Sequence, residues 1–240
     1  MAKLFKSILL MSSVIMLSGC LYPESEKEKN NPPREAQIQM VQTAVEQFQQ
    51  ENDGILPIKT LADQREYLEH QIDFTRLTPN YLSDIPTTAY ENGGFYQYVI
   101  IDAEDNPTVK VADLRITEEV RSLTTRLNIL GNNVELSETI GPNVYQLDLE
   151  KYHLESNPTV TSPYTGDSLN VYYNGGREFI VDYRSDAQKI INEKNLSFNT
   201  GEDIRSIFYE YTEVVPLYSP ELTVDENNEV IFMTSKHKEK

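Results

Sequence analysis

The sequence is poor in the residues that carry metal and redox chemistry. Its 240 residues include one cysteine, three histidines and no tryptophan. A single cysteine cannot form an internal disulfide or a cysteine-based zinc site, so we expect no metal centre and no cofactor. Basic residues are also scarce, at 21 against 38 acidic ones, which gives a net charge of −17. Binding to nucleic acid needs clustered Lys and Arg, so this balance argues against a nucleic-acid partner.

Long hydrophobic runs are missing as well. The apolar stretch after Lys3 and Lys6 extends from Ile8 to Leu17, and a spanning helix needs about 20 apolar residues. A charged start followed by a short apolar run is the layout of an export signal. We therefore predict that residues 1–19 are a signal peptide.

The signal ends in Leu17-Ser18-Gly19-Cys20, which resembles the bacterial lipobox. The resemblance implies diacylglyceryl transfer to the Cys20 thiol, cleavage before Cys20 and attachment to the extracytoplasmic face of the cell membrane. Two acyl chains hold a protein there stably. The alternative is an ordinary signal peptide with a chance cysteine. Residues 20–33 then form the lipidated cysteine and a polar, proline-punctuated tether that spans about 40 Å when extended.

The first part of the body has a helix-then-strand pattern. A helix should begin near Asn31-Pro32 and end at Asp53-Gly54, because apolar residues recur every three or four positions. These residues are Ile38, Val41, Ala44, Val45 and Phe48. The pattern further predicts a short helix over Leu61–Ile72, a connector over Pro79–Pro86, and strands over Phe95–Asp102 and Thr108–Leu114.

The second part repeats this order. Thr117 is a plausible N-cap for a helix whose apolar face consists of Val120, Leu123, Leu127 and Leu130. Four more elements are expected as hairpin strands at Asn133–Leu136 with Val144–Leu149, and at Asn170–Tyr173 with Glu178–Tyr183. A helix near Ser185 and a last strand pair, Leu222–Val224 with Val230–Met233, complete the prediction.

These elements predict an α+β fold, with amphipathic helices packed on antiparallel hairpins. A loose echo joins Tyr81-Leu82 and Gly93-Gly94 to His153-Leu154 and Gly175-Gly176. It suggests two related modules, residues 34–115 and 116–240. A single interleaved domain is the alternative.

Two resemblances add to this interpretation. Val41–Phe48, Asn52-Asp53-Gly54 and Pro79–Pro86 resemble the globular part of type II pseudopilins, which implies a pilin-like fold. The long apolar helix that forms fibres in that family is replaced here by the lipobox. The whole chain, with its Cys20-Leu21-Tyr22-Pro23 start, is similar to YphF-type lipoproteins of low-GC Gram-positive bacteria, which implies a location and no mechanism.

One sequence motif suggests catalysis. Gly166-Asp167-Ser168-Leu169 has the letters of the GDSL esterase signature, in which the serine is the nucleophile. That signature normally lies near the start of its domain and needs an Asp three residues before a C-terminal histidine. Here Thr234 stands three residues before His237. The motif reads better as a turn, and we predict no catalytic residue.

Other residues carry weaker signals. His70 and His153 have no partners at metal-ligand spacing, and the acidic stretches Asp102–Asp105 and Asp225–Glu229 lack the EF-hand pattern for calcium. Whether these loops bind Ca²⁺ stays open. Six of the fifteen tyrosines cluster late in the chain, and tyrosine serves both half-buried strands and binding clefts. They are Tyr164, Tyr172, Tyr173, Tyr183, Tyr209 and Tyr211.

Three functions remain from these observations. The first is a non-enzymatic interaction module of the cell envelope that contacts another envelope protein. The second is a solute- or glycan-binding lipoprotein, which a tyrosine-lined cleft would favour. The third is an esterase dependent on Ser168.

Overall fold

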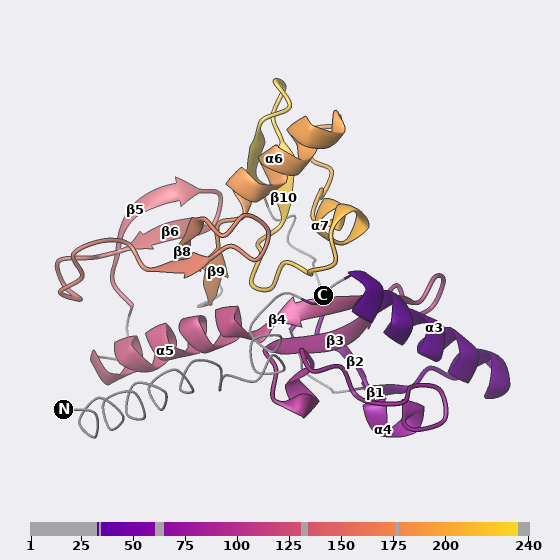
Figure 1. The fold of residues 1–240 in the computed structure, drawn as a ribbon. Helices are drawn as coiled ribbons and strands as arrows, with labels where there is room; N and C mark the ends of the chain where they lie inside the picture. Colours follow the sequence, from indigo (N-terminus) through magenta and orange to yellow (C-terminus); the bar gives the residue numbers. More distant parts are fainter. Residues whose placement is uncertain (1–32, 34, 61–64, 131–133, 176–177, 235–240) are drawn as a thin grey trace, which may run out of the picture.

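The computed structural model describes residues 33, 35–60, 65–130, 134–175 and 178–234. Its architecture is α+β, with antiparallel sheets and packed helices as the sequence predicts (Figure 1). Among the described residues, none of the helices has both the length and the apolar composition that a bilayer crossing requires. Cys20, the signal and most of the tether lie outside the described residues.

The first part of the chain is one helix on a four-stranded antiparallel sheet of order β1-β2-β3-β4. Its elements are α3 (Glu35–Glu51), β1 (Ile58–Thr60), β2 (His70–Ile72), α4 (Phe74–Leu77), the 3-10 helix η1 (Tyr90–Asn92), β3 (Tyr96–Ile101) and β4 (Thr108–Asp113).

Helix α3 confirms the predicted apolar stripe. All five predicted residues are buried, and they pack against residues of β3 and β4. The Gln42 side chain accepts the N–H of Val109 at 2.7 Å and donates to the carbonyl of Pro107 at 3.1 Å. These two bonds pair backbone groups at the start of β4 that have no partner strand on that side, so the helix is fixed to the sheet.

The helix predicted over Leu61–Ile72 is wrong for the described residues of that range. Residues 61–64 lie outside the described part, and His70–Ile72 forms β2, which pairs with β1 and with Val99 of β3. Leu68 and Ile72 have helical spacing, but they enter different apolar clusters. A three-residue strand is too short to show the alternation that identifies strands in a sequence.

The predicted helix start at Asn31-Pro32 lies outside the described residues, and α3 begins at Glu35. The two strands and the connector predicted for this part hold. Strands β3 and β4 pair along their whole length, from Tyr96 opposite Asp113 to Ile101 opposite Thr108. Residues 102–107 form the turn between them. The connector Pro79–Pro86 has neither helix nor strand, although α4, just before it, was not predicted.

The second part contains a five-stranded sheet in which β9 and β6 flank β8, together with a separate two-stranded hairpin. Its elements are α5 (Leu114–Leu130), β5 (Leu136–Gly141), β6 (Val144–Leu147), β7 (Thr159–Thr161), β8 (Ser168–Asn174), β9 (Phe179–Val181), α6 (Arg184–Lys194), α7 (Ser206–Tyr211), β10 (Leu222–Val224) and β11 (Val230–Phe232). Helix α5 runs beneath the sheet that contains β5, β6 and β8 (Figure 1).

The hairpins and the helix near Ser185 match the prediction, with two corrections. The first strand of the β5–β6 hairpin lies at Leu136–Gly141 and so begins where the predicted strand ends. Helix α5 begins at Leu114 and not at Thr117. Strand β7 and helix α7 were not predicted, because each is short and has no clear period.

An Asp-x-Arg arrangement explains the early start of α5. The Asp113 carboxylate accepts the backbone N–H of Arg115 at 3.0 Å and also binds its guanidinium. The Asp113 carboxylate therefore caps the first turn of α5. Because it also neutralises the guanidinium of Arg115, this arginine adds no net positive charge at the N-terminus of the helix, where the helix dipole is already positive. Asp182 with Arg184 and Asp203 with Arg205 repeat these contacts before α6 and α7.

The two parts of the chain make direct contact. Residues 213–215 lie alongside β4, where Val111 donates to the carbonyl of Glu213 and accepts from the N–H of Val215, both at 2.9 Å. Val215 and Leu217 are fully buried against residues of the first sheet. Because the segment 213–217 belongs to the C-terminal half, contacts cross the predicted boundary at 115/116. The division into two modules stays a prediction.

Candidate functional site

The structure describes some of the residues that the sequence suggested for catalysis. Ser168 is the exposed first residue of β8, opposite Thr161 of β7, and residues 163–165 before it form a turn. His237 lies outside the described residues. His70 lies in β2, and His153 is exposed in a loop with a positive φ of 51°.

The two acidic stretches are turns between strands. In the β10–β11 turn, the Asp225 carboxylate accepts the N–H groups of Glu229 and Asn227 at 2.9 and 2.8 Å. These bonds lower the pKa of Asp225. The carboxylate thus completes the turn, as Asp commonly does. Within the described residues, no group of three or more His, Cys, Asp or Glu side chains is placed to hold a metal ion.

Most of the late tyrosines belong to the core. Tyr183 is fully buried, and its hydroxyl donates to the carbonyl of Leu217 at 3.0 Å. Tyr164 stacks on Phe208 with ring centroids 4.7 Å apart, and its hydroxyl donates to the carbonyl of Val214. Burial raises the pKa of both tyrosines, so both hydroxyls stay protonated as donors. These rings join the two parts of the chain and do not line a cleft.

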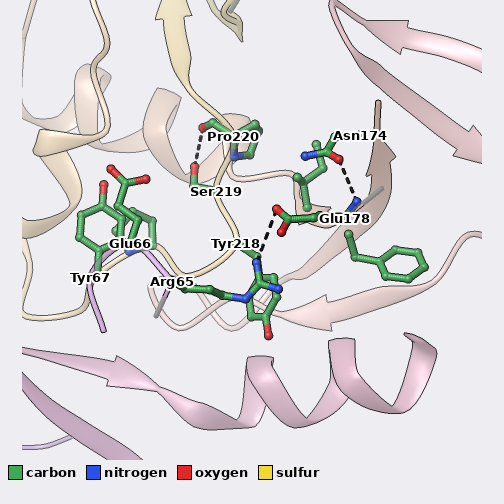
Figure 2. A pocket seen from close by; sticks show the side chains of 11 residues that line it. Arg65, Glu66, Tyr67, Asn174, Glu178, Tyr218, Ser219 and Pro220 are labelled. Atoms are coloured by element: carbon green, nitrogen blue, oxygen red, sulfur yellow. Dashed lines mark hydrogen bonds and ion pairs between the residues drawn. The ribbon is translucent and has the colours of Figure 1, made fainter. Parts of the chain in front are cut away.

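A cleft of about 520 Å³ does lie where the two parts meet (Figure 2). We call it the junction cleft. Three segments far apart in sequence form it: residues 65–67 before β2, residues around the β8–β9 turn, and residues 216–220. Its lining residues are Arg65, Glu66, Tyr67, Asn174, Glu178, Phe179, Ile180, Pro216, Tyr218, Ser219 and Pro220.

Arg65 and Tyr218 form the centre of the junction cleft (Figure 2). The guanidinium carbon of Arg65 lies 4.1 Å from the centroid of the Tyr218 ring, a cation–π contact. Its Nη1 is 3.8 Å from Oε2 of Glu178, which is an ion pair without a hydrogen bond. Arg65 comes from the first part, and both of its neighbours come from the second.

A second arginine closes the wall beside Tyr67. Arg205 is 8 % exposed and binds Glu66 at 2.6 Å and Asp203 through two nitrogens. Burial alone would lower the pKa of Arg205, but its hydrogen bonds to Asp203 and the charges around it raise that pKa. The ion pair with Glu66 again connects the two parts of the chain, so one wall of the cleft is held by charge as well as by packing.

Two of the cleft tyrosines have an unusual backbone. Tyr67 and Tyr218 have φ values of 70° and 64°, in the left-handed region that bulky residues rarely adopt. Such strain costs about 1–3 kcal/mol at each residue and is concentrated at functional sites. Burial also raises the pKa of Tyr67, which keeps its hydroxyl protonated. The strain supports a binding role for this cleft.

A second hollow of about 600 Å³ adjoins the junction cleft, because Tyr67 lines both. Tyr67 and Tyr209 lie 5.9 Å apart there. Five carboxylate side chains surround them, on Glu69, Asp102, Glu104, Asp105 and Glu210. The second hollow is therefore lined by acidic side chains, whereas the junction cleft has the guanidinium of Arg65 in its lining.

The described lining residues of the junction cleft suit binding. They offer guanidinium, amide and hydroxyl donors, carboxylate acceptors and tyrosine faces. Sequence reasoning missed this site. Arg65 and Tyr67 lie in the range predicted as a helix, and Tyr218 lies in a segment without a period. The only sequence signal was the pair of prolines that flank Tyr218.

The comparisons with known proteins concern the first part of the chain. No curated protein and no solved structure matches the sequence. Residues 34–113 match the model of the YphF family N-terminal domain. The match runs from the start of α3 to the end of β4 and so covers the first sheet with its helix. Over this third of its length, the chain is similar to the N-terminal domain of the YphF family.

Proposed function

We propose that the protein is an extracytoplasmic lipoprotein, held in the cell membrane by lipid on Cys20, and that it acts as a non-enzymatic protein-interaction module of the cell envelope. The lipobox resemblance of residues 17–20 supports the anchor. The match of residues 34–113 to the YphF family agrees with the similarity to YphF-type lipoproteins. The tether places the folded part near the bilayer, within reach of other envelope proteins.

A pilin-like origin for both modules is part of this proposal. In the first part, the connector Pro79–Pro86 leads into the antiparallel strands β3 and β4, the order that the pseudopilin resemblance implies, although β1, β2 and α4 stand between α3 and this connector. Both β3–β4 and β8–β9 are antiparallel hairpins that lead through an Asp-x-Arg arrangement into a helix. This repeated order supports a duplication.

The junction cleft is the observation that carries the proposal. Tyrosine and arginine dominate the energetics of protein interfaces, and here Arg65, Tyr67 and Tyr218 line one cleft built from both parts of the chain. Partner binding would engage both parts at once. The cleft's donors and acceptors would set specificity, while its rings supply contact area.

Solute or glycan binding is the second candidate. A cleft of about 520 Å³ has the size of small-molecule sites, which run from about 300 to 1,000 Å³. Arg65, Glu178 and Asn174 have planar polar groups that match sugar hydroxyls, beside tyrosine rings. An esterase centred on Ser168 receives no such support, because Ser168 is an exposed strand residue outside this cleft.

Photo-crosslinking in cells tests the proposal. A photoreactive amino acid at Ser219 in the cleft is compared with one at Thr125, which is exposed on α5. We expect one recurrent envelope protein from position 219 only, and its loss in a Cys20→Ala background that leaves the membrane. The same adducts from both positions, or adducts to background proteins alone, would contradict a protein partner at the cleft. A Cys20→Ala protein that stays processed and membrane-bound would contradict the anchor.

A further inference from the structure

We infer that the junction cleft binds a carboxylate on an extended peptide segment of the partner, with the guanidinium of Arg65 as its receptor and Glu178 as an internal competitor. This inference rests on the proposed function and names the chemistry of the partner. It concerns Arg65, Glu178, Asn174 and Tyr218, which lie close together in Figure 2.

Arg65 has guanidinium donors for which the described residues supply no hydrogen-bond partner. The guanidinium carbon lies 4.1 Å from the centroid of the Tyr218 ring, which limits the movement of the side chain, and its ion pair with Glu178 at 3.8 Å is longer than a hydrogen bond. The side chain is 41 % exposed, so a ligand can reach it. A guanidinium has five donors in a planar fork, which fits the two oxygens of a carboxylate. The guanidinium of Arg65 is therefore positioned to donate hydrogen bonds to a carboxylate ligand.

Asn174 adds a donor from the opposite wall. Its Oδ1 accepts the backbone N–H of Glu178 at 2.9 Å, and this bond fixes which end of the amide faces the chain. The Nδ2 group is then the end left to the cleft (Figure 2). Donors from Arg65 and Asn174 together favour a ligand group that only accepts.

Glu178 already occupies the place of such a ligand. Its carboxylate lies 3.8 Å from Arg65, and its side chain is 56 % exposed. An exposed ion pair of this kind contributes little, so an incoming carboxylate can displace it. Glu178 thus shows that a carboxylate fits beside Arg65, and it lowers the affinity for any competitor.

The surrounding charges do not forbid this ligand. Glu66 shares the single positive charge of Arg205 with Asp203, so this group keeps one net negative charge beside the cleft, and a ligand carboxylate must gain more from Arg65 than it loses to that charge. The net charge of −17 repels anions at long range, but charges beyond about 8 Å are largely screened at physiological ionic strength. Contacts within the cleft therefore decide the affinity, and the global charge mainly slows association.

A peptide is the source that the lining favours. Tyr67 and Tyr218, with Pro216 and Pro220, give the cleft the aromatic and apolar contact surface on which protein segments dock. A carboxylated sugar presents the same acceptor group, and it is treated as an outcome of the test.

Saturation-transfer NMR on the full-length protein in detergent micelles tests the inference. The probes are N-acetyl-trialanine with a free carboxylate, its C-terminal amide, N-acetyl-Ala-Glu-Ala-amide and sodium glucuronate. We expect binding of the peptides that carry a carboxylate and none of trialanine amide. The two carboxylate peptides distinguish a C-terminus from an acidic side chain.

Variants give opposite expectations for the two charged residues. Arg65→Gln should weaken carboxylate-peptide binding about tenfold or more, the worth of charge-assisted hydrogen bonds, and Arg65→Lys should weaken it as well, since the fork is lost. Glu178→Gln should tighten binding about two- to fivefold. Arg121→Gln removes an arginine that pairs with Glu118 on the exposed face of α5, and it should change nothing.

Each other result overturns the inference. Equal binding of acid and amide, binding of glucuronate alone, weaker binding by Glu178→Gln, or an equal effect of Arg121→Gln would each contradict it. If crosslinking from position 219 identifies a partner while the carboxylate probes do not bind, only the inference fails. If the probes bind through Arg65 and no partner is crosslinked, the proposed protein partner fails instead.

Discussion

Replacing Leu217 by alanine tests whether the segment that follows α7 joins the two parts of the chain. Leu217 is fully buried in a cluster with Leu68, Val99 and Ala112 of the first part. The substitution removes three buried carbon groups at about 0.8 kcal/mol each, and the cavity left behind adds to that loss. We expect a loss of about 3 kcal/mol in the free energy of unfolding.

This loss is large against the whole stability of a domain, which is about 5–15 kcal/mol. Urea unfolding of a form that starts at residue 21, followed by far-ultraviolet circular dichroism and by tyrosine absorbance, measures it. Both probes should report one transition, shifted to lower urea. Leu136→Ala is the matched control, because Leu136 is 38 % exposed at the edge of a sheet, and it should cost less than about 1 kcal/mol.

Two results would refute this reasoning. A loss below about 1 kcal/mol for Leu217→Ala would mean that the buried segment contributes little. Two separate transitions, of which only one moves, would mean that the contacts between the parts do not couple their folding. In either case the junction cleft would lack the rigid frame that the account gives it.

Two further predictions concern single buried positions. Burial raises the pKa of Asp186, which is 2 % exposed; the folded state therefore keeps this proton to higher pH than the unfolded state, whose pKa is about 3.9. The contribution of Asp186 to stability therefore falls as pH rises from the unfolded pKa to the folded one. Urea midpoints measured at pH 4 and pH 7 should show that the stability of the wild type relative to Asp186→Asn decreases. An increase would contradict a raised pKa for Asp186. Gly94→Ala should cost about 2 kcal/mol or more, because its Cβ would lie 2.1 Å from the carbonyl oxygen of Thr88. Gly54→Ala, where φ is 82° and nothing lies within 4 Å, should cost only its backbone strain of about 1 kcal/mol, and equal melting temperatures for the two variants would disprove the clash.

The elements that the sequence predicted well are those with long, regular burial. The stripe on α3 was identified because each of its residues meets the sheet, and the hairpins were identified because their turns are rich in Asn, Asp and Gly. The N-cap of α5 was placed four residues late, since Thr117 looked like a cap while Asp113 acts as one. Asp113 caps the helix together with Arg115, two residues later, and this Asp-x-Arg pattern can be recognised as a cap only once the structure shows that the two side chains pair.

The candidate site was beyond prediction for a different reason. Arg65, Glu178 and Tyr218 meet where the C-terminal half packs on the first part, with residues 213–215 alongside β4, and nothing in the local sequence predicts that contact. Sequence patterns report what a segment does with its own neighbours, by period and by turn chemistry. The junction cleft depends on long-range packing between three segments, and strain at Tyr67 and Tyr218 is visible only in backbone angles.

Isolation of the tagged, full-length protein from membranes tests the central claim most directly. The wild type, Arg65→Gln, Tyr218→Ala and Arg121→Gln would be captured in parallel, and the proteins recovered with each would be quantified by mass spectrometry. We expect one recurrent envelope protein that is recovered with the wild type and with Arg121→Gln, and that is strongly depleted with both cleft variants. Equal recovery with all four forms, or no recurrent protein with any of them, would contradict the cleft as a docking site for a protein partner.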